Sequence, residues 1–157
     1  MKTVQVPLKI QKTDDLGYFS GYASVFNIQD SHGDIIKPGA FQHSIEKLEK
    51  ENRMPKMLWQ HDHTLPIGLW TFIEEDHYGL YVEGKLLLDV QKSKEAYTLL
   101  KAKAVDGLSI GYSVEQAYKN QDGGRTITKI NLHEISIVTF ASNSQAFVQC
   151  VKKDDLL

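Results

Sequence analysis

Alternation of apolar and polar residues is the feature that most restricts the fold of this chain. It is clearest in residues 4–10 and 18–26. A period of two puts successive side chains on opposite faces of an extended segment, so these stretches are predicted to be half-buried strands. Further stretches with strand character are 56–60, 67–74, 80–88, 108–117, 126–130 and 132–139. Strands in this number predict a mostly β chain arranged as a barrel or a sandwich.

Two stretches break the alternation and have the spacing of short helices instead. Residues 40–51 and 93–105 both place apolar side chains on one helical face. Asp106 and Gly107 follow the second stretch as a stop signal. The Asp-Gly-Gly run at 122–124 tolerates positive φ and predicts a hairpin between two strands.

Length and composition limit the chain to one compact domain, which we assign to residues 1–151, with 152–157 as a short polar tail. Of 157 residues, 41% are hydrophobic, and a chain of this size buries roughly 70% of its unfolded surface. The net charge of -2 gives no electrostatic reason to expect a nucleic-acid partner. The single cysteine, Cys150, excludes an internal disulfide and suits a reducing compartment. No apolar run predicts a secretory signal or a membrane span, so we expect a soluble, cytosolic protein.

Two imidazoles flank a carboxylate where a strand-like run ends, at His61, Asp62 and His63, just before residues 64–66, which are expected to form a turn. Strand ends beside loops commonly carry reactive groups, although solvated polar residues are the simpler interpretation. A zinc site would need a further ligand, and the spacing matches no dedicated zinc motif. The residues that could supply that ligand are His77, His133 and Glu134. We expect no metal and no cofactor.

Ser109 lies in a strand-like stretch with apolar side chains on one face and small ones on the other, which Ser109 shares with Gly111 and Ser113. The stretch matches G-x-S-x-G, but a nucleophile elbow has a strand before the serine and a helix after it. Here that order is reversed. An α/β-hydrolase also places its acid and then its histidine after the serine, whereas only His133 follows. We therefore reject that fold; a serine in such a position, considered alone, is more often inert.

Glu134 is a carboxylate in a strongly apolar strand, on the same face as Leu132, Ser136 and Val138. Burying it is unfavourable unless a partner compensates its charge. A lysine would be a structural partner, and an imidazolium formed during proton transfer would be a functional one. With Ser109 and His61, Glu134 completes the residue types of a nucleophile, a base and an orienting acid, which are defined by geometry and not by chain order. Spacing alone does not show that they meet.

Five motifs, in one order along nearly the whole chain, resemble those of a known family. They are GYASVF at 21–26, DSHGDIIKPGAF at 30–41, LWQHD at 58–62, GLSIGY at 107–112 and LHEISIVTF at 132–140. Together they resemble the prohead, or capsid maturation, proteases of tailed bacteriophages, which are relatives of the herpesvirus assemblins.

The resemblance implies a serine endopeptidase with a β-barrel flanked by helices. Such an enzyme cleaves capsid scaffold, precursor segments of the major capsid protein and itself inside the assembling prohead, in the host cytoplasm. By position, Ser109 would be the nucleophile, His61 the base and Glu134 the third member. The herpesvirus relatives use a second histidine there, which keeps His133 as a rival, with Asp62 a weaker one. A homodimer or higher oligomer is compatible with this assignment, and no nucleic acid or membrane is an expected partner.

Two further segments are predicted to be structural. Residues 30–34 carry several polar groups, but the glycine and proline around them favour a tight turn leading into the first helix over a cation site. Residues 146–151 are expected to close the core. Apart from the lysines at 152 and 153, Cys150 lacks the basic neighbours that a reactive thiolate needs. The alternative function is a non-catalytic β-barrel scaffold or capsid-associated binding protein, which would tolerate the loss of His61.

Overall fold

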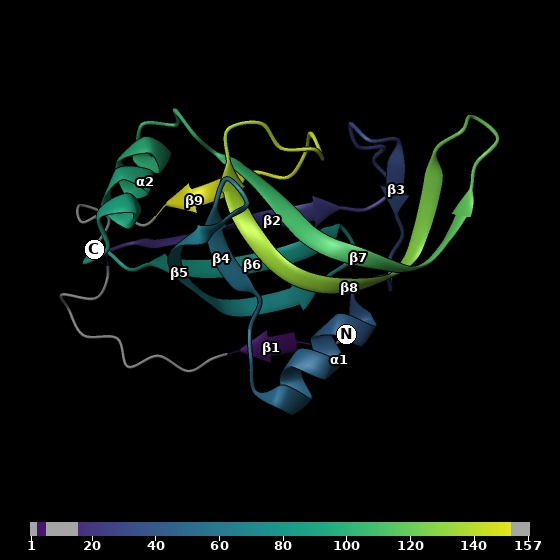
Figure 1. Cartoon of the computed structure of the whole chain (residues 1–157), viewed down its shortest axis with the longest axis horizontal. Helices are drawn as coiled ribbons and strands as arrows, with labels where there is room; N and C mark the ends of the chain where they lie inside the picture. Colours follow the sequence, from purple (N-terminus) through teal and green to yellow (C-terminus); the bar gives the residue numbers. More distant parts are fainter. Residues whose placement is uncertain (1–2, 6–15, 152–157) are drawn as a thin grey trace.

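A computed structural model describes residues 3–5 and 16–151, and within them nine strands form one curled sheet with two helices outside it (Figure 1). The predicted mostly β fold with flanking helices is confirmed as a curled half-barrel. In chain order the elements are β1 (Thr3–Gln5), β2 (Tyr18–Val25), β3 (Asp34–Ile36), α1 (Gln42–Glu51), β4 (Lys56–Trp59), β5 (Asp62–Glu75), β6 (Gly79–Leu86), α2 (Gln91–Lys101), β7 (Gly107–Lys119), β8 (Arg125–Val138) and β9 (Val148–Val151).

Strand β8 pairs with three other strands, β3, β4 and β7. The sheet runs β3-β8-β4-β5-β6-β2-β9, with β1 beside β5 and β7 beside β8. β7 lies antiparallel to β8 along its length, whereas β3 and β4 pair with β8 in parallel, Lys56 opposite Glu134. Residues of β4 and β7 therefore flank the same stretch of β8, although they are far apart in the sequence.

The buried hydrophobic side chains form one cluster that extends from the sheet to both helices. Trp70 on β5 is fully buried and meets Phe19 edge to face, with ring centroids 5.4 Å apart. Its indole N–H donates a hydrogen bond to the Ile135 carbonyl at 3.3 Å. This contact connects β5 to β8 through the core and gives β8 a rigid support.

A buried carboxylate from β5 holds the start of α1. The residue before the helix, Phe41, offers no side-chain cap. Glu75, 3% exposed, accepts hydrogen bonds from the backbone N–H groups of Gly39 at 3.0 Å and Phe41 at 3.2 Å, and from the Gln42 side chain at 2.6 Å. The N-terminal amides of a helix favour a negative charge. The buried Glu75 carboxylate thereby has hydrogen-bond partners, and it acts as the cap of α1. Sequence reasoning did not identify this role.

Two local expectations are wrong, and a third is confirmed in part. Residues 64–66, expected to form a turn, lie within β5, because the chain has already turned at residues 60–61. The tight turn predicted at 30–34 is present, since the Gly33 N–H donates to the Asp30 carbonyl at 3.1 Å, but it leads into β3, which begins at Asp34, and not directly into the first helix. Asp34 receives a bidentate ion pair from Arg125, with distances of 3.0 and 2.9 Å. The second helix ends at Lys101 and not near 105.

Other boundaries follow the sequence more closely. The strands predicted at 126–130 and 132–139 are one continuous strand, β8. Most of the alternating stretch at 4–10, and the tail at 152–157, lie outside the described residues. Among the helices of the described part, neither has the length and apolar character needed to cross a membrane.

Candidate active site

His61 is carried by a tight turn between β4 and β5. Trp59 pairs with Asp62, so Gln60 and His61 are the two central residues, with φ values of 53° and 59°. Positive φ at both central positions is typical of type I′ hairpins, whose twist matches that of the flanking strands. Side-chain-bearing residues adopt this conformation infrequently, so surrounding contacts must stabilise it.

Those contacts come from β8 and the residue after it. The Gln60 backbone N–H donates to the Ile137 carbonyl at 2.9 Å. The Gln60 side chain donates to Thr139 Oγ1 at 2.7 Å and accepts from the Thr139 N–H at 3.1 Å. The His61 N–H donates to Ser136 Oγ at 3.0 Å. The turn is therefore fixed relative to β8.

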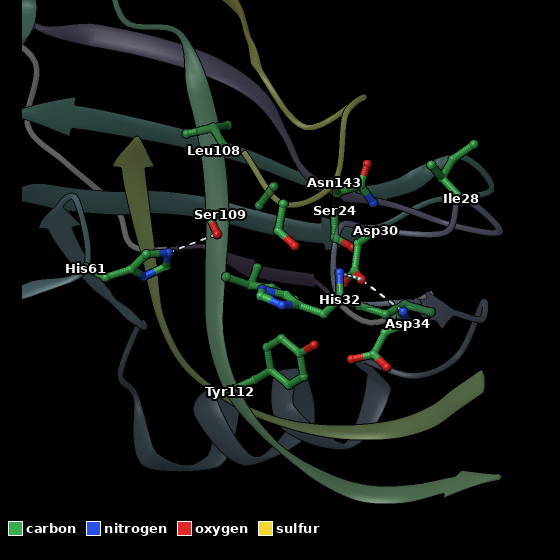
Figure 2. Close-up of a pocket in the computed structure, with 14 residues that line it drawn as sticks. Ser24, Ile28, Asp30, His32, Asp34, His61, Leu108, Ser109, Tyr112 and Asn143 are labelled. Atoms are coloured by element: carbon green, nitrogen blue, oxygen red, sulfur yellow. Dashed lines mark hydrogen bonds between the residues drawn. The ribbon is translucent and has the colours of Figure 1, made fainter. Parts of the chain in front are cut away.

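Ser109 and Glu134 reach the same place from β7 and β8. Ser109 pairs with Ser136, and Gly111 pairs with Glu134. Directly opposed residues of an antiparallel pair share one face of the sheet. On that face, His61 Nε2 lies 2.9 Å from Ser109 Oγ, a hydrogen bond that Figure 2 draws as a dashed line. His61 Nδ1 is hydrogen-bonded to Glu134 Oε1. The hydroxyl, the imidazole and the carboxylate thus form one continuous hydrogen-bonded series.

Glu134 is the most buried member of this series. The His61 side chain is 42% exposed and the Glu134 side chain 8%, while Ser109 is half-buried. Gly111 explains how the carboxylate fits against β7, because a Cβ at this position would collide with the Glu134 carboxylate. The acid is shielded from water, whereas the hydroxyl can be reached from solvent.

Glu134 raises the pKa of His61 above its ordinary value. The hydrogen bond between them is the largest cause, the charge of the carboxylate adds to it, and partial burial of the ring acts in the opposite direction. A raised pKa means that the imidazolium is stabilised. A proton removed from Ser109 could therefore be held on the ring.

The two rival residues have other partners. His133 is exposed, and its Nε2 lies 3.1 Å from Ser113 Oγ. The Asp62 carboxylate accepts hydrogen bonds from the Thr64 hydroxyl at 2.6 Å and the Thr64 N–H at 2.8 Å, which lower its pKa. The structure brings Glu134 to the His61 ring and places His133 and Asp62 in other hydrogen bonds. Among residues 3–5 and 16–151, no three His, Cys, Asp or Glu side chains gather as metal ligands would.

A cleft of about 140 Å³ opens beside Ser109, and both Ser109 and His61 line it (Figure 2). Its apolar lining includes Leu108 and Ile110 from β7. On another side, Asp30 Oδ1 accepts the backbone N–H groups of residues 32 and 34, both at 2.9 Å, which shapes that loop. The hydroxyl therefore faces a recess with polar and apolar walls.

Sequence reasoning missed Gln60, Gly111 and Ser136 as parts of this site. Their roles depend on the pairing of β7 with β8 and on the turn at β4, neither of which a local pattern reveals. One signal was present for Ser136, since it shares the apolar face of Glu134 and needs a polar partner just as the carboxylate does.

A hydrogen-bonded serine, histidine and carboxylate on a rigid sheet is the arrangement that defines triad-type serine hydrolases. The chain belongs to the caudovirus prohead serine protease family, whose model matches residues 5–156. The family expected from the five motifs is thus confirmed.

Two curated relatives are similar in sequence. The prohead protease of Enterobacteria phage HK97 is 39% identical over 142 residues, covering 88% of this chain, and the capsid polyprotein of Pseudomonas phage PAJU2 is 30% identical over 127 residues, covering 75%. The chain spans 62% of the length of the first relative and 19% of the second.

Two solved structures are similar in fold. The bacteriophage T4 capsid assembly protease has a TM-score of 0.65 at 9% identity, covering 88% of this chain and 95% of that one. The KSHV protease, solved with a hexapeptide phosphonate inhibitor, has a TM-score of 0.52 at 10% identity, covering 83% and 63%. At such identities the likeness concerns the fold, and it confirms the predicted relation to phage and herpesvirus protease folds.

Proposed function

We propose that this chain is a serine endopeptidase of phage capsid maturation, with Ser109 as nucleophile, His61 as general base and Glu134 as the orienting acid. The observation that carries the proposal is the continuous hydrogen-bonded series from Ser109 Oγ through the His61 ring to Glu134, beside a cleft. Membership of the prohead serine protease family supports the same chemistry.

The reaction begins when Ser109 Oγ attacks the carbonyl carbon of the scissile peptide bond. His61 Nε2 takes the hydroxyl proton, and the resulting imidazolium donates that proton to the leaving amine as the C–N bond breaks. A water molecule then attacks the acyl ester, with His61 again accepting and returning the proton. The products are a free carboxylate, a free amine and regenerated Ser109.

Glu134 contributes by orientation and charge. Its hydrogen bond to Nδ1 keeps the proton of the neutral ring on that nitrogen, so that Nε2 offers its lone pair to Ser109. Its negative charge stabilises the imidazolium during the reaction, in agreement with the raised pKa of His61. Because Glu134 is buried, water screens this interaction only weakly.

The proposed substrates are segments of the capsid scaffold and of the major capsid protein precursor, together with the chain itself. The proposed place of action is the interior of the assembling prohead in the host cell. Support comes from the family description and from the names of the two relatives, a prohead protease and a capsid polyprotein.

The decisive experiment incubates the purified protein with the capsid proteins encoded beside it and follows cleavage by mass spectrometry. We expect Ser109→Ala to lower cleavage about 10,000-fold or more while circular dichroism and thermal melting stay unchanged. Ser113→Ala, on the same strand, is the matched control and should retain wild-type cleavage. A fluorophosphonate probe provides a substrate-independent measurement, because it should label Ser109 only.

Undiminished cleavage by Ser109→Ala would refute the assignment of the nucleophile. Absence of both cleavage and probe labelling in the wild-type protein would instead favour a non-catalytic capsid-associated protein with this fold.

A further inference from the structure

Ser136 connects the turn that carries His61 with the carboxylate that faces it. Its Oγ accepts a hydrogen bond from the His61 backbone N–H at 3.0 Å and donates one to Glu134 Oε2 at 2.6 Å. The residue is completely buried, with 0% exposure, and it does not line the cleft. Ser136 can therefore influence a bound peptide only through its neighbours.

The directions of these hydrogen bonds follow from elementary chemistry. A backbone N–H can only donate, so Ser136 Oγ must be the acceptor in its contact with His61. The hydroxyl has a single proton, which is then available for Glu134 Oε2. Both oxygens of a carboxylate can only accept, so the proton in the contact between Glu134 Oε1 and the imidazole belongs on Nδ1. In the neutral ring, Nε2 then carries no proton and directs its lone pair at Ser109. The direction of the Ser136 hydrogen bonds is fixed by the His61 backbone N–H, which can only donate.

We propose that Ser136 is a positioning residue of the peptidase, which holds Glu134 and the His61 turn as one unit and fixes the Nδ1–H tautomer of the His61 ring. The inference rests on the proposed function of Ser109, His61 and Glu134. The backbone of His61 supports it independently, because a φ of 59° in a non-glycine residue needs a stabilising contact and the Ser136 hydroxyl receives its N–H.

Loss of the hydroxyl would act on orientation more than on the fold of the turn. The Ser136→Ala change leaves the His61 N–H and one oxygen of Glu134 without this partner, which is unfavourable for polar groups at a buried position. The Gln60 contacts with Thr139 would still attach the turn to the end of β8. The turn should therefore persist while the ring and the carboxylate sample wrong orientations.

A matched control lies on α1, where a buried serine is hydrogen-bonded to the backbone of β8. Ser44 on α1 is 2% exposed, accepts the Leu132 N–H at 2.9 Å and donates to the Ile130 carbonyl at 2.7 Å. It is a buried serine with the same pattern of one accepted and one donated hydrogen bond, but neither partner belongs to the candidate site. Ser44→Ala should destabilise the fold through the same kind of loss without disturbing His61.

The first test measures peptide cleavage by Ser136→Ala, Ser136→Cys and Ser44→Ala. We expect Ser136→Ala to lower kcat about 10- to 100-fold, the range typical of lost supporting hydrogen bonds at a reactive site. KM should stay within about twofold because Ser136 touches no substrate. Ser136→Cys, which retains a weak donor, should recover part of the rate, and Ser44→Ala should keep the wild-type kcat.

The second test reads the ring itself and does not require cleavage. In ¹⁵N spectra of the neutral imidazole, wild-type His61 should show the Nδ1–H tautomer, Ser136→Ala a mixture of tautomers, and Ser44→Ala the wild-type pattern. Hydrogen exchange of the His61 amide should accelerate only in Ser136→Ala.

Wild-type kcat together with a wild-type tautomer in Ser136→Ala would overturn the inference. If the wild-type protein cleaves nothing, the proposed function fails, while the ring spectra still decide the role of Ser136. Should Ser136→Ala not fold, the same measurements on Ser136→Cys decide it.

Discussion

Strands β7 and β8 take part in two serine–histidine pairs, and only one of them has the surroundings of a reactive site. Ser109 Oγ lies 2.9 Å from His61 Nε2, and Ser113 Oγ lies 3.1 Å from His133 Nε2. The distances are nearly equal, and the two serines lie four residues apart on β7. Distance alone therefore does not distinguish the pairs.

The partners of the two histidines do distinguish them. The second ring nitrogen of His61 meets the buried Glu134 carboxylate, whereas within the described ranges no carboxylate contacts His133. Ser109 lines the cleft, and Ser113 is exposed and does not. An imidazole without an orienting acid has no fixed tautomer, so its serine stays a weak nucleophile. The comparison indicates that the orienting carboxylate and the neighbouring cleft, and not the serine–histidine distance, distinguish the candidate active site.

Removal of each histidine should separate the pairs most strongly. His61→Ala eliminates the proposed base and should reduce kcat/KM about 10,000-fold or more. His133→Ala should leave kcat/KM at the wild-type value and change the free energy of unfolding by less than about 0.5 kcal/mol, as for an ordinary surface residue. Kinetics with a capsid-derived peptide and urea denaturation provide the two readouts. Comparable losses in both variants would end the distinction.

The next largest effect should come from Glu134→Gln. The amide has the size of the carboxylate but no charge, so the imidazolium loses its partner and the ring tautomer is no longer fixed. We expect kcat to fall by on the order of 1,000- to 10,000-fold. Glu115→Gln is the control, since Glu115 is an exposed β7 glutamate whose ion pair with Lys129, at 3.6 Å, lies outside the site. A larger loss from His133→Ala would instead make the second histidine the orienting residue.

A smaller effect should follow from Gly111→Ala. The new methyl group would enter the space of the Glu134 carboxylate and displace it from His61. Misplacement by about 1 Å can lower a rate about 100-fold, so we expect a loss of about 10- to 100-fold in kcat. Ser113→Ala, which also places an alanine on β7, should have no such effect. An unaltered rate in Gly111→Ala would show that the carboxylate tolerates the shift.

The mildest test is the pH dependence of cleavage. Only neutral His61 can accept the Ser109 proton, and its pKa is raised from 6.5 by Glu134. The rate should therefore fall as the pH drops through a value above 6.5, and Glu134→Gln should move this acidic limb to lower pH. If the acidic limb lay at the same pH in both proteins, Glu134 would not be the cause of the raised pKa of His61.

The same pKa shift makes a prediction about stability with a definite sign. A raised pKa means that the folded state binds the proton more tightly than the unfolded state does. The stabilisation is complete below the unfolded pKa of His61 and is lost as the pH rises through the folded pKa. Urea denaturation of the wild type and of Glu134→Gln across this window would reveal it.

Local patterns predicted the parts of the fold that depend on neighbouring residues. The alternation at 18–26 became β2, Tyr18–Val25, and the helical spacing at 40–51 became α1, Gln42–Glu51. β3 and the cap from Glu75 were missed because both require contacts between distant parts of the chain. No nearby residue indicates such contacts.

The candidate site divides in the same way. His61, Ser109 and Glu134 could be proposed from their chemistry and their motifs. The turn at Gln60 and His61 could not, because glutamine does not favour positive φ and the conformation is stabilised by contacts with β8. The part played by Gly111 depends on its pairing with Glu134, which appears only when β7 and β8 come together.

The parallel pairing of β4 with β8 has a consequence for the order in which the molecule matures. The hydrogen bond of His61 to Glu134 joins residues 73 positions apart in the chain. Contacts of such long range form slowly because a large loop has to close first. During synthesis the emerging polypeptide therefore has its imidazole long before β8 leaves the ribosome. We expect each newly made chain to remain inert until translation of that strand is complete, which protects its own unfolded segments from premature cutting.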